Sequence, residues 1–334
     1  MVKITSYGVR PIERPYFDDL NKYGFDMTYV EDLLTHDNAE ASKGADAVLV
    51  RGNCLADRQN LEKFASWGIK YVFTRSVGFN HMDLQAAADL GIEMARVPGY
   101  SPYAVAELAF TLGMNLFRHV NLGISQTRQA DFTISPAMFS KEIHTATVGI
   151  VGIGRIGYTE AKLYKALGAK VVAYDPYPSD AAKELAEMMD LPDLLKQSDI
   201  VSVHVPYFPG KNEDLIDDQF VSQMKQGAVL INTARGELAN IPAILKGLAD
   251  GHLDGYGADV VVDEVNILGK QFASVDDIPN QQVRDLVRAN PRVLITPHVG
   301  SYTEPALQDM ISISYDNFHD ILTTGATKNA IHAK

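Results

Sequence analysis

The sequence predicts an α/β protein with two doubly wound parallel sheets, and three observations lead to this fold class. Its 334 residues exceed the length that one hydrophobic core usually serves, so two domains are expected. Short apolar runs alternate with helical patterns along the chain, which is typical of parallel strands covered by helices on both faces. A glycine-rich turn between Thr147 and Asp175 joins a strand to a helix and a second strand, as a βαβ unit requires.

Composition and charge exclude several classes of protein. The hydrophobic content of 46% is ordinary for a soluble globular protein, and no apolar run is long enough to span a bilayer. A net charge of −12 disfavours nucleic acid and anionic membranes as partners. The single cysteine, Cys54, cannot form an internal disulfide, and the N-terminus lacks the apolar core of a signal peptide. We therefore expect a cytoplasmic protein whose ligands are small molecules, with no nucleic acid and no membrane among its partners.

The first domain is expected to combine residues 1–100 with residues 301–334. Five short apolar runs predict its strands, at residues 2–5, 25–29, 46–50, 70–74 and 93–96. Helical patterns such as Leu61–Ala65 and Leu84–Leu90 separate these runs, so the strands are expected to pair in parallel.

Two features mark the passages between the domains. Helix breakers cluster from Pro98 to Pro102, and a long helix is predicted after Ser101. The pattern Ser301-Tyr-Thr-Glu304 is that of a capping box, so a helix is predicted to open there and to return to the first domain.

The second domain, residues 101–300, is organised around the glycine-rich turn. Gly152 is expected to make the tight turn, Gly154 to let the backbone approach a pyrophosphate, and Gly157 to let the helix pack closely on its strand. Further strands are predicted at residues 200–204, 228–232, 254–259 and 293–296. Residues 265–290 lack clear periodicity and are expected to form a long loop with a short helix.

The glycine turn predicts a cofactor. The helix that follows it begins near Arg155 and Ile156, where free N–H groups and the positive end of the helix dipole would hold phosphates. Asp175 ends the second strand, where a carboxylate accepts hydrogen bonds from the adenosine ribose and repels a 2′-phosphate. NAD rather than NADP is therefore the predicted cofactor.

Three strand ends after the glycine turn carry polar groups that an ordinary core would not need. They are Asn232–Gly236, Asp259–Glu264 and Thr296–His298. An arginine such as Arg235 holds a carboxylate with two parallel hydrogen bonds. A protonated His298 can donate to a carbonyl oxygen as hydride arrives, and a carboxylate such as Glu264 can orient that imidazole. These three side chains suit the reduction of a 2-oxo acid.

The remaining histidines do not stand at strand ends together with a candidate arginine and carboxylate. Those interpreted as structural or exposed are His81, His119, His144, His204 and His252. The nine histidines include no HxxxH pair and no CxxC companion, so no metal site is predicted.

Together these motifs resemble the D-isomer-specific 2-hydroxyacid dehydrogenases. The resemblance covers essentially the whole chain, including His204-Val-Pro206 and Tyr100-Ser-Pro102. It is strongest to the branch that holds D-lactate, D-2-hydroxyisocaproate and (R)-2-hydroxyglutarate dehydrogenases. It implies a Rossmann NAD-binding domain inserted in a flavodoxin-like substrate domain, and a homodimer formed through the NAD-binding domains.

The resemblance also implies roles for single residues. Arg235 is expected to bind the substrate, His298 to act as the acid and base, and Glu264 to pair with it. The backbone of Val77 and Gly78 is expected at the substrate carboxylate. Expected around the cofactor are Val205, Pro206, Thr233, Ala234, Asp259 and His298. The chain departs from the family pattern where Val262 replaces the first glutamate of Asp-x-x-Glu-x-Glu.

The predicted function is the reversible, NAD-dependent reduction of pyruvate or a longer 2-oxo acid to the D-2-hydroxy acid. An NAD-sensing interaction protein on the same fold is an alternative, but the chain keeps the full set of Arg235, Glu264 and His298 and has no peptide-motif segment. A formate or phosphite dehydrogenase is another alternative. It is disfavoured because formate chemistry needs no proton donor to a carbonyl oxygen.

The substrate side chain is left open by the sequence. Arg51 follows the apolar run Ala47–Val50, at a strand end where ligand groups are expected. It could pair with a second carboxylate, as its surroundings resemble the (R)-2-hydroxyglutarate branch, or it could be a structural arginine held by a neighbouring acid. A site lined by Tyr100 and Tyr302 would suit an aliphatic or aromatic monocarboxylic acid equally well.

Overall fold

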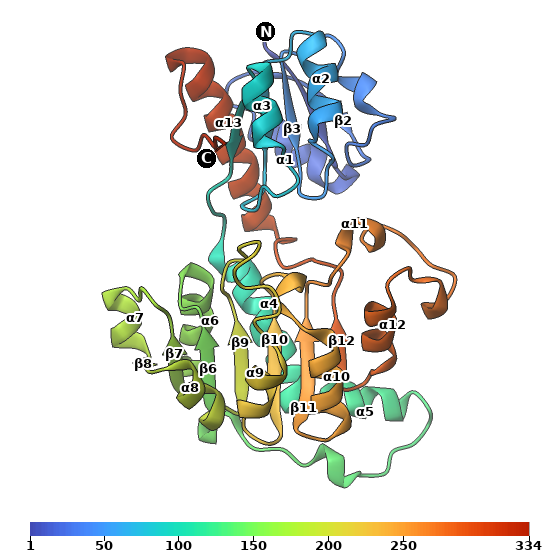
Figure 1. Cartoon of the computed structure of the whole chain (residues 1–334), viewed down its shortest axis with the longest axis vertical. Helices are drawn as coiled ribbons and strands as arrows, with labels where there is room; N and C mark the ends of the chain where they lie inside the picture. The colour runs from blue at the N-terminus through green and yellow to red at the C-terminus, as the bar shows by residue number, and fades with distance from the viewer. Residues whose placement is uncertain (334) are drawn as a thin grey trace. The chain divides into compact units, whose positions relative to one another are not determined.

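The computed structural model describes residues 1–333, which divide into two compact units. Unit 1 consists of Met1–Ser101 together with the chain from Tyr302 onwards, and unit 2 is Pro102–Ser301. Each unit contains one sheet whose strand pairs are all parallel, with helices packed on it (Figure 1). The predicted fold class is therefore confirmed. Within residues 1–333, no helix has both the length and the apolar character needed to cross a membrane.

Unit 1 has the strand order β2-β1-β3-β4-β5, which is the doubly wound, flavodoxin-like order. Its strands are β1 (Lys3–Tyr7), β2 (Asp26–Val30), β3 (Ala47–Val50), β4 (Tyr71–Thr74) and β5 (Glu93–Arg96). Its helices are α1 (Arg14–Asp19), α2 (Arg58–Ser66), α3 (Leu84–Leu90) and α13 (Glu304–Thr324), with 3₁₀ turns η1 (Pro11–Glu13) and η2 (Ala39–Ser42). The Phe318 ring of α13 stacks on the Phe73 ring of β4 with 4.4 Å between centroids, so α13 completes the core of unit 1.

Unit 2 has the strand order β12-β11-β10-β9-β6-β7-β8. Its strands are β6 (Thr147–Val151), β7 (Lys170–Tyr174), β8 (Glu187–Met188), β9 (Ile200–Val203), β10 (Ala228–Asn232), β11 (Leu253–Ala258) and β12 (Val293–Ile295). Its helices are α4 (Pro102–Phe117), α5 (Val120–Thr127), α6 (Arg155–Ala166), α7 (Asp180–Leu185), α8 (Leu191–Gln197), α9 (Asp218–Gln223), α10 (Ile241–Ala249), α11 (Glu264–Ile267) and α12 (Gln281–Arg288), and its 3₁₀ turns are η3 (Pro136–Met138), η4 (Ile143–Thr145), η5 (Gly236–Leu238) and η6 (Val275–Asp277). The order reverses between β6 and β9, and ligands of doubly wound sheets bind at such a switch point.

Glycines on β11 let helix α4 lie close to the sheet. A Cβ atom on Gly257 would stand 3.1 Å from the Cβ of Leu112, and one on Gly255 would stand 2.9 Å from a methyl carbon of Leu116. Both leucines are buried. The missing side chains therefore set the distance between α4 and the strand that leads to the polar loop after Ala258.

One sequence expectation is wrong in detail. Helix α13 begins at Glu304 after an extended Thr303, and no side chain caps its first turn. Glu304 is thus the first helical residue and not the third, so Ser301 cannot form the predicted capping box. Pro305, in the first turn of the helix, favours the later start.

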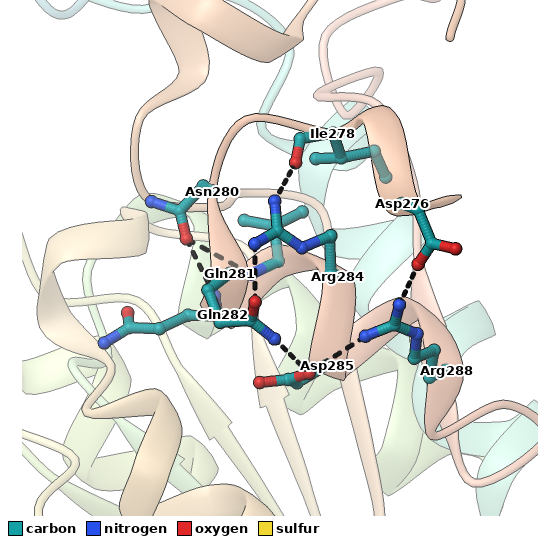
Figure 2. Close-up of polar contacts among 9 residues, drawn as sticks. Asp276, Ile278, Asn280, Gln281, Gln282, Arg284, Asp285 and Arg288 are labelled. Carbon is teal, nitrogen blue, oxygen red and sulfur yellow. Dashed lines mark hydrogen bonds and ion pairs between the residues drawn. The ribbon is translucent and has the colours of Figure 1, made fainter. Parts of the chain in front are cut away.

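Residues 265–290 form a long loop with the short helix α12, as expected, together with the end of α11 and the turn η6. The Asn280 side chain accepts hydrogen bonds from the backbone N–H groups of Gln282 and Val283, at 2.9 and 3.3 Å. Figure 2 shows this cap together with the contacts of two arginines of the helix. Arg284 donates to the Ile278 carbonyl and Arg288 pairs with Asp276, which tie α12 to the segment before it. Within the helix, Arg284 contacts Gln281 and Arg288 contacts Asp285. Val283 and Leu286 are buried, so an apolar face and polar contacts together hold α12.

Candidate functional site

The glycine turn after β6 has the geometry that a pyrophosphate requires. Gly152 has φ of 91°, a conformation that side chains disfavour. A Cβ on Gly157 would stand 2.2 Å from the carbonyl oxygen of Gly152, so helix α6 touches the turn. Gly154 caps α6, and a Cβ there would meet nothing within 4 Å. Free space beside the first N–H groups of α6 fits the approach of a phosphate.

The predicted ribose and nicotinamide contacts follow β7 and β9, the two strands that flank β6. Asp175 follows β7, and its carboxylate accepts a hydrogen bond from the Tyr177 N–H at 2.8 Å. Val205 follows β9, and a Cβ on Gly152 would stand 3.0 Å from its backbone nitrogen. The segment of Val205 and Pro206 therefore packs against the glycine turn. Arg155 is exposed and Ile156 is half-buried at the start of α6.

The loop after β10 presents Arg235 in a fixed backbone. The Asn232 side chain accepts from the Ala234 N–H at 3.0 Å and donates to the Arg235 carbonyl at 2.9 Å. Arg235 itself is extended, with Nη1 donating to the Ala234 carbonyl at 2.6 Å. A Cβ on Gly236 would stand 2.2 Å from the Val261 backbone, so this loop rests on the segment after β11. Thr233 is buried in the same loop.

The buried carboxylate of Asp259 organises the loop after β12. It accepts hydrogen bonds from the Thr296 hydroxyl at 2.5 Å and from the N–H groups of Val299 and Gly300 at 2.8 and 2.7 Å. Burial raises the pKa of Asp259, and these three donors oppose that shift. Asp259 therefore holds the backbone on both sides of His298, and its oxygens are engaged by protein groups.

The Glu264 and His298 side chains form a hydrogen-bonded pair. Nδ1 of His298 lies 2.8 and 3.0 Å from the two carboxylate oxygens of Glu264. Both residues depend on unusual backbone, because His298 has φ of 55° and Asp263, which precedes the first turn of α11, has φ of 62°. The side chain of His298 is 35% exposed and that of Glu264 is 17% exposed. The pair thus leaves Nε2 of His298 available to a ligand.

The three expected catalytic side chains lie in loops that follow adjacent strands. Arg235 follows β10, Glu264 lies beyond β11, and His298 follows β12. A cation that holds a carboxylate, a proton donor and an acid that charges the donor are together able to reduce a 2-oxo acid. Among residues 1–333, no group of three or more His, Cys, Asp or Glu side chains is arranged to hold a metal ion.

The expected substrate residues Arg51, Val77, Gly78, Tyr100 and Tyr302 belong to unit 1. Arg51 follows β3, and the loop of Val77 and Gly78 follows β4. Tyr302 is 48% exposed and Tyr100 is half-buried. The structure therefore places these residues in other strand-end segments than those of Arg235, Glu264 and His298.

An arginine cluster in unit 1 was not expected from the sequence. It consists of Arg10, Arg51 and Arg75 around the single carboxylate of Glu13. Glu13 and Arg75 form a buried ion pair at 2.8 Å, and Nη1 of Arg10 lies 3.2 Å from the second oxygen of Glu13. The Arg10 guanidinium also lies 4.4 Å above the Tyr302 ring. Arg10 and Glu13 follow β1, Arg51 follows β3 and Arg75 follows β4. These segments are far apart in sequence, and they meet because β1, β3 and β4 are neighbours in the sheet.

A histidine–glutamate pair next to the glycine turn was also not predicted from the sequence. The buried His204 side chain contacts the carboxylate of the buried Glu160 and, at 3.0 Å, the hydroxyl of Ser202. Glu160 lies on α6 and His204 directly precedes Val205. The pair therefore ties the helix of the glycine turn to the segment after β9. No spacing rule connects two residues on different elements, so from the sequence His204 was interpreted only as structural or exposed.

Comparison with known proteins covers the whole chain. The family model for the NAD-binding domain of D-isomer-specific 2-hydroxyacid dehydrogenases matches residues 110–300. A D-2-hydroxyacid dehydrogenase (NAD+) of Lacticaseibacillus paracasei is 34% identical over 334 residues, which cover 99% of this chain and 98% of the relative. The solved structure of a D-2-hydroxyisocaproate dehydrogenase matches with a TM-score of 0.88 at 34% identity, covering 99% of this chain and 100% of the other. The NAD-complexed D-isomer-specific 2-hydroxyacid dehydrogenase of Lactobacillus delbrueckii ssp. bulgaricus matches with a TM-score of 0.85 at 32% identity, covering 99% and 100%.

Proposed function

The chain belongs to the D-isomer-specific 2-hydroxyacid dehydrogenase family and is an NAD-dependent oxidoreductase of D-2-hydroxy acids, and we propose that Arg235, Glu264 and His298 carry its chemistry. The observation that supports these roles is the hydrogen-bonded pair of Glu264 and His298, whose free Nε2 can face a ligand. Arg235 lies in the loop after β10 and His298 in the loop after β12, and β11 is the one strand between them.

Each side chain has one task in the proposed reduction. NADH, when bound, supplies hydride to the carbonyl carbon of the 2-oxo acid. Arg235 holds the substrate carboxylate through its planar guanidinium. By the family resemblance, the N–H groups of Val77 and Gly78 are also proposed to bind carboxylate. His298 donates the proton from Nε2 to the carbonyl oxygen, which becomes the hydroxyl, and Glu264 stabilises the imidazolium before transfer. One 2-oxo acid, one NADH and one proton thus give one 2-hydroxy acid and NAD.

The product of the reaction is expected to be the D (R) 2-hydroxy acid. The purified protein is tested for NADH oxidation with pyruvate, 2-oxoisocaproate, phenylpyruvate, 2-oxoglutarate and oxaloacetate, and each product is resolved by chiral chromatography. An L product would contradict the proposed placement of Arg235 and His298 around the carbonyl, because those groups fix which face of the carbonyl receives hydride.

We propose that Asp175 makes the enzyme select NADH. Its carboxylate follows β7 next to the glycine turn, where a ribose 2′-phosphate would meet a negative charge. The unmodified enzyme is expected to have a higher kcat/KM with NADH than with NADPH, and Asp175→Ala is expected to narrow that ratio by about tenfold. Equal use of both cofactors by the unmodified enzyme would show that Asp175 does not discriminate.

We also propose that the enzyme is a cytoplasmic homodimer formed through unit 2. Helix α5 and the segment after it present large apolar side chains to solvent, with Phe132 80% exposed and Ile134 and Phe139 each 91% exposed. An apolar surface of this kind is typical of a subunit interface. Cys54 is buried and free, as a reducing compartment allows. The mass of the purified protein in solution tests the dimer.

A second carboxylate on the substrate is favoured by the arginine cluster. Among residues 1–333, no acid forms an ion pair with Arg51, and the two oxygens of Glu13 pair with Arg10 and Arg75. Burial, followed by the charges of Arg10 and Arg75, lowers the pKa of Arg51 to about 10. Three guanidinium groups around one carboxylate leave a positive charge that an anion would stabilise. We therefore propose a dicarboxylic 2-oxo acid such as 2-oxoglutarate or oxaloacetate as a substrate.

Arg51→Leu tests this proposal. The variant is expected to raise KM for 2-oxoglutarate or oxaloacetate by about 100-fold, because it deletes a charge-assisted pair, and to change KM for pyruvate and 2-oxoisocaproate little. Steady-state kinetics with all four acids provides the comparison. If the unmodified enzyme ignores both dicarboxylic acids, Arg51 is a structural or pocket-shaping residue and the preferred substrate is a monocarboxylic acid.

A further inference from the structure

The loop that follows β4 has its carbonyl groups held by protein side chains. Nη1 of Arg96 donates to the Val77 carbonyl at 2.9 Å, and the Ser76 hydroxyl donates to the Gly78 carbonyl at 2.7 Å. Ser76 is in turn 2.7 Å from the Thr74 hydroxyl at the end of β4. In the described part of the chain, the N–H groups of Val77 and Gly78 have no acceptor. The loop thus has engaged carbonyls and free donors.

The contact with Arg96 determines where one of those donors points. The Val77–Gly78 peptide bond is trans, so its C=O and N–H groups point in opposite directions. Because the carbonyl is directed at Arg96, the Gly78 N–H is directed away from Arg96. A charged donor on the carbonyl also polarises the peptide group and makes its N–H a stronger donor to an anion. Arg96 can therefore both orient and strengthen the Gly78 N–H.

The side chain of Arg96 serves this loop and nothing else in the described residues. Its guanidinium lies 5.3 Å above the Phe79 ring, next to the bonded Val77 carbonyl. No carboxylate within residues 1–333 forms an ion pair with it, so its charge is directed to the loop. The contacts of Arg96 with α13 and the C-terminal segment use only its main chain, which accepts from Asn317 and donates to the Asn329 carbonyl. A different side chain at this position keeps those contacts.

We propose that Arg96 is a positioning residue for the substrate carboxylate, acting through the Val77–Gly78 peptide. The inference rests on the proposed function, in which the N–H groups of Val77 and Gly78 bind that carboxylate. It adds a residue that never touches the substrate but sets how well the loop binds it. Ser76 binds the next carbonyl, that of Gly78, and so orients the Phe79 N–H, which is outside the proposed carboxylate site.

The test compares Arg96→Met with Arg96→Lys. Methionine keeps the apolar contact with Phe79 but cannot donate, and lysine can still donate one charged hydrogen bond. Arg96→Met is expected to raise KM for the 2-oxo acid about tenfold and to weaken inhibition by oxamate, a carboxylate analogue of pyruvate, by the same factor. KM for NADH and kcat are expected to change less than about threefold, and Arg96→Lys is expected to recover most of the loss.

Arg58→Met is the matched control, because Arg58 is an exposed arginine of unit 1 that pairs with Asp89 at 2.6 Å. It is expected to leave all constants unchanged. An unchanged KM and oxamate affinity in folded Arg96→Met would overturn the inference, as would a general loss of kcat, NADH binding and Tm that lysine does not rescue. Failure of the proposed function is distinct, because the unmodified enzyme would then reduce no 2-oxo acid and bind no oxamate, and the inference would fall with it.

Discussion

His298→Ala is expected to lower kcat for 2-oxo acid reduction by about 100-fold or more, because it deletes the group that donates a proton to the carbonyl oxygen. The substitution removes an imidazole that is 35% exposed, so the fold is expected to survive it. His36→Ala is the matched control, since His36 is 36% exposed and pairs with Asp57 at 2.7 Å in unit 1. Near wild-type kcat in His298→Ala would mean that another group is the acid.

Glu264→Gln separates the charge of the partner from its hydrogen bond. Glutamine keeps the shape of the side chain but removes the negative charge beside His298. Without that charge the imidazolium that donates the proton is no longer stabilised, so kcat for 2-oxo acid reduction is expected to fall. The loss is expected to be smaller than in His298→Ala, because glutamine still accepts the hydrogen bond that orients the ring. An unchanged kcat in Glu264→Gln would contradict the pairing as a source of charge stabilisation.

Gly157→Ala is expected to raise the Kd for NADH by more than about tenfold and to lower Tm by several degrees. Its new Cβ would stand 2.2 Å from the Gly152 carbonyl oxygen, so the start of α6 must move away from the turn. Overpacking of this kind typically costs about 1–3 kcal/mol of stability. Fluorescence titration with NADH and a thermal melt measure the two effects.

Gly154→Ala provides the comparison for that variant. Its Cβ would meet no protein atom within 4 Å, so Tm is expected to stay unchanged. NADH binding is nevertheless expected to weaken by about tenfold, because the methyl group occupies the space in which a phosphate approaches the backbone. If Gly154→Ala binds NADH normally, the pyrophosphate does not lie against Gly154.

The sequence predicted the elements that depend on local patterns. Buried parallel strands are short apolar runs, so β9, β10 and β12 could be placed within a residue. The start of α13 was misplaced because Ser301 and Glu304 match a capping box in letters, while the backbone stays extended through Thr303. The short helix expected within residues 265–290 is α12, which buries Val283 and Leu286 and whose first turn is capped by Asn280.

In the candidate site, too, some features could be predicted from local sequence patterns and others depend on tertiary packing. Arg235, Glu264 and His298 could be proposed because each stands near a strand end, where chain order alone gives the edge of the sheet on which it falls. The positive φ of His298 could not be inferred from any neighbouring residue, since it depends on Asp259 holding Val299 and Gly300. The Glu160 and His204 pair and the grouping of Arg10 with Arg75 result from tertiary packing.

Unit 1 is closed by the last helix of the chain, and this has a consequence for biosynthesis. A ribosome delivers Met1–Ser101 first, but Phe73 and its neighbours stay without the Phe318 side of their core until α13 emerges. Unit 2 is continuous in sequence and can fold while the rest is translated. Before α13 emerges, the nascent chain therefore carries a folded unit 2 and an incomplete unit 1 whose sheet has an exposed apolar face. At this stage chaperones and proteases have access to that face.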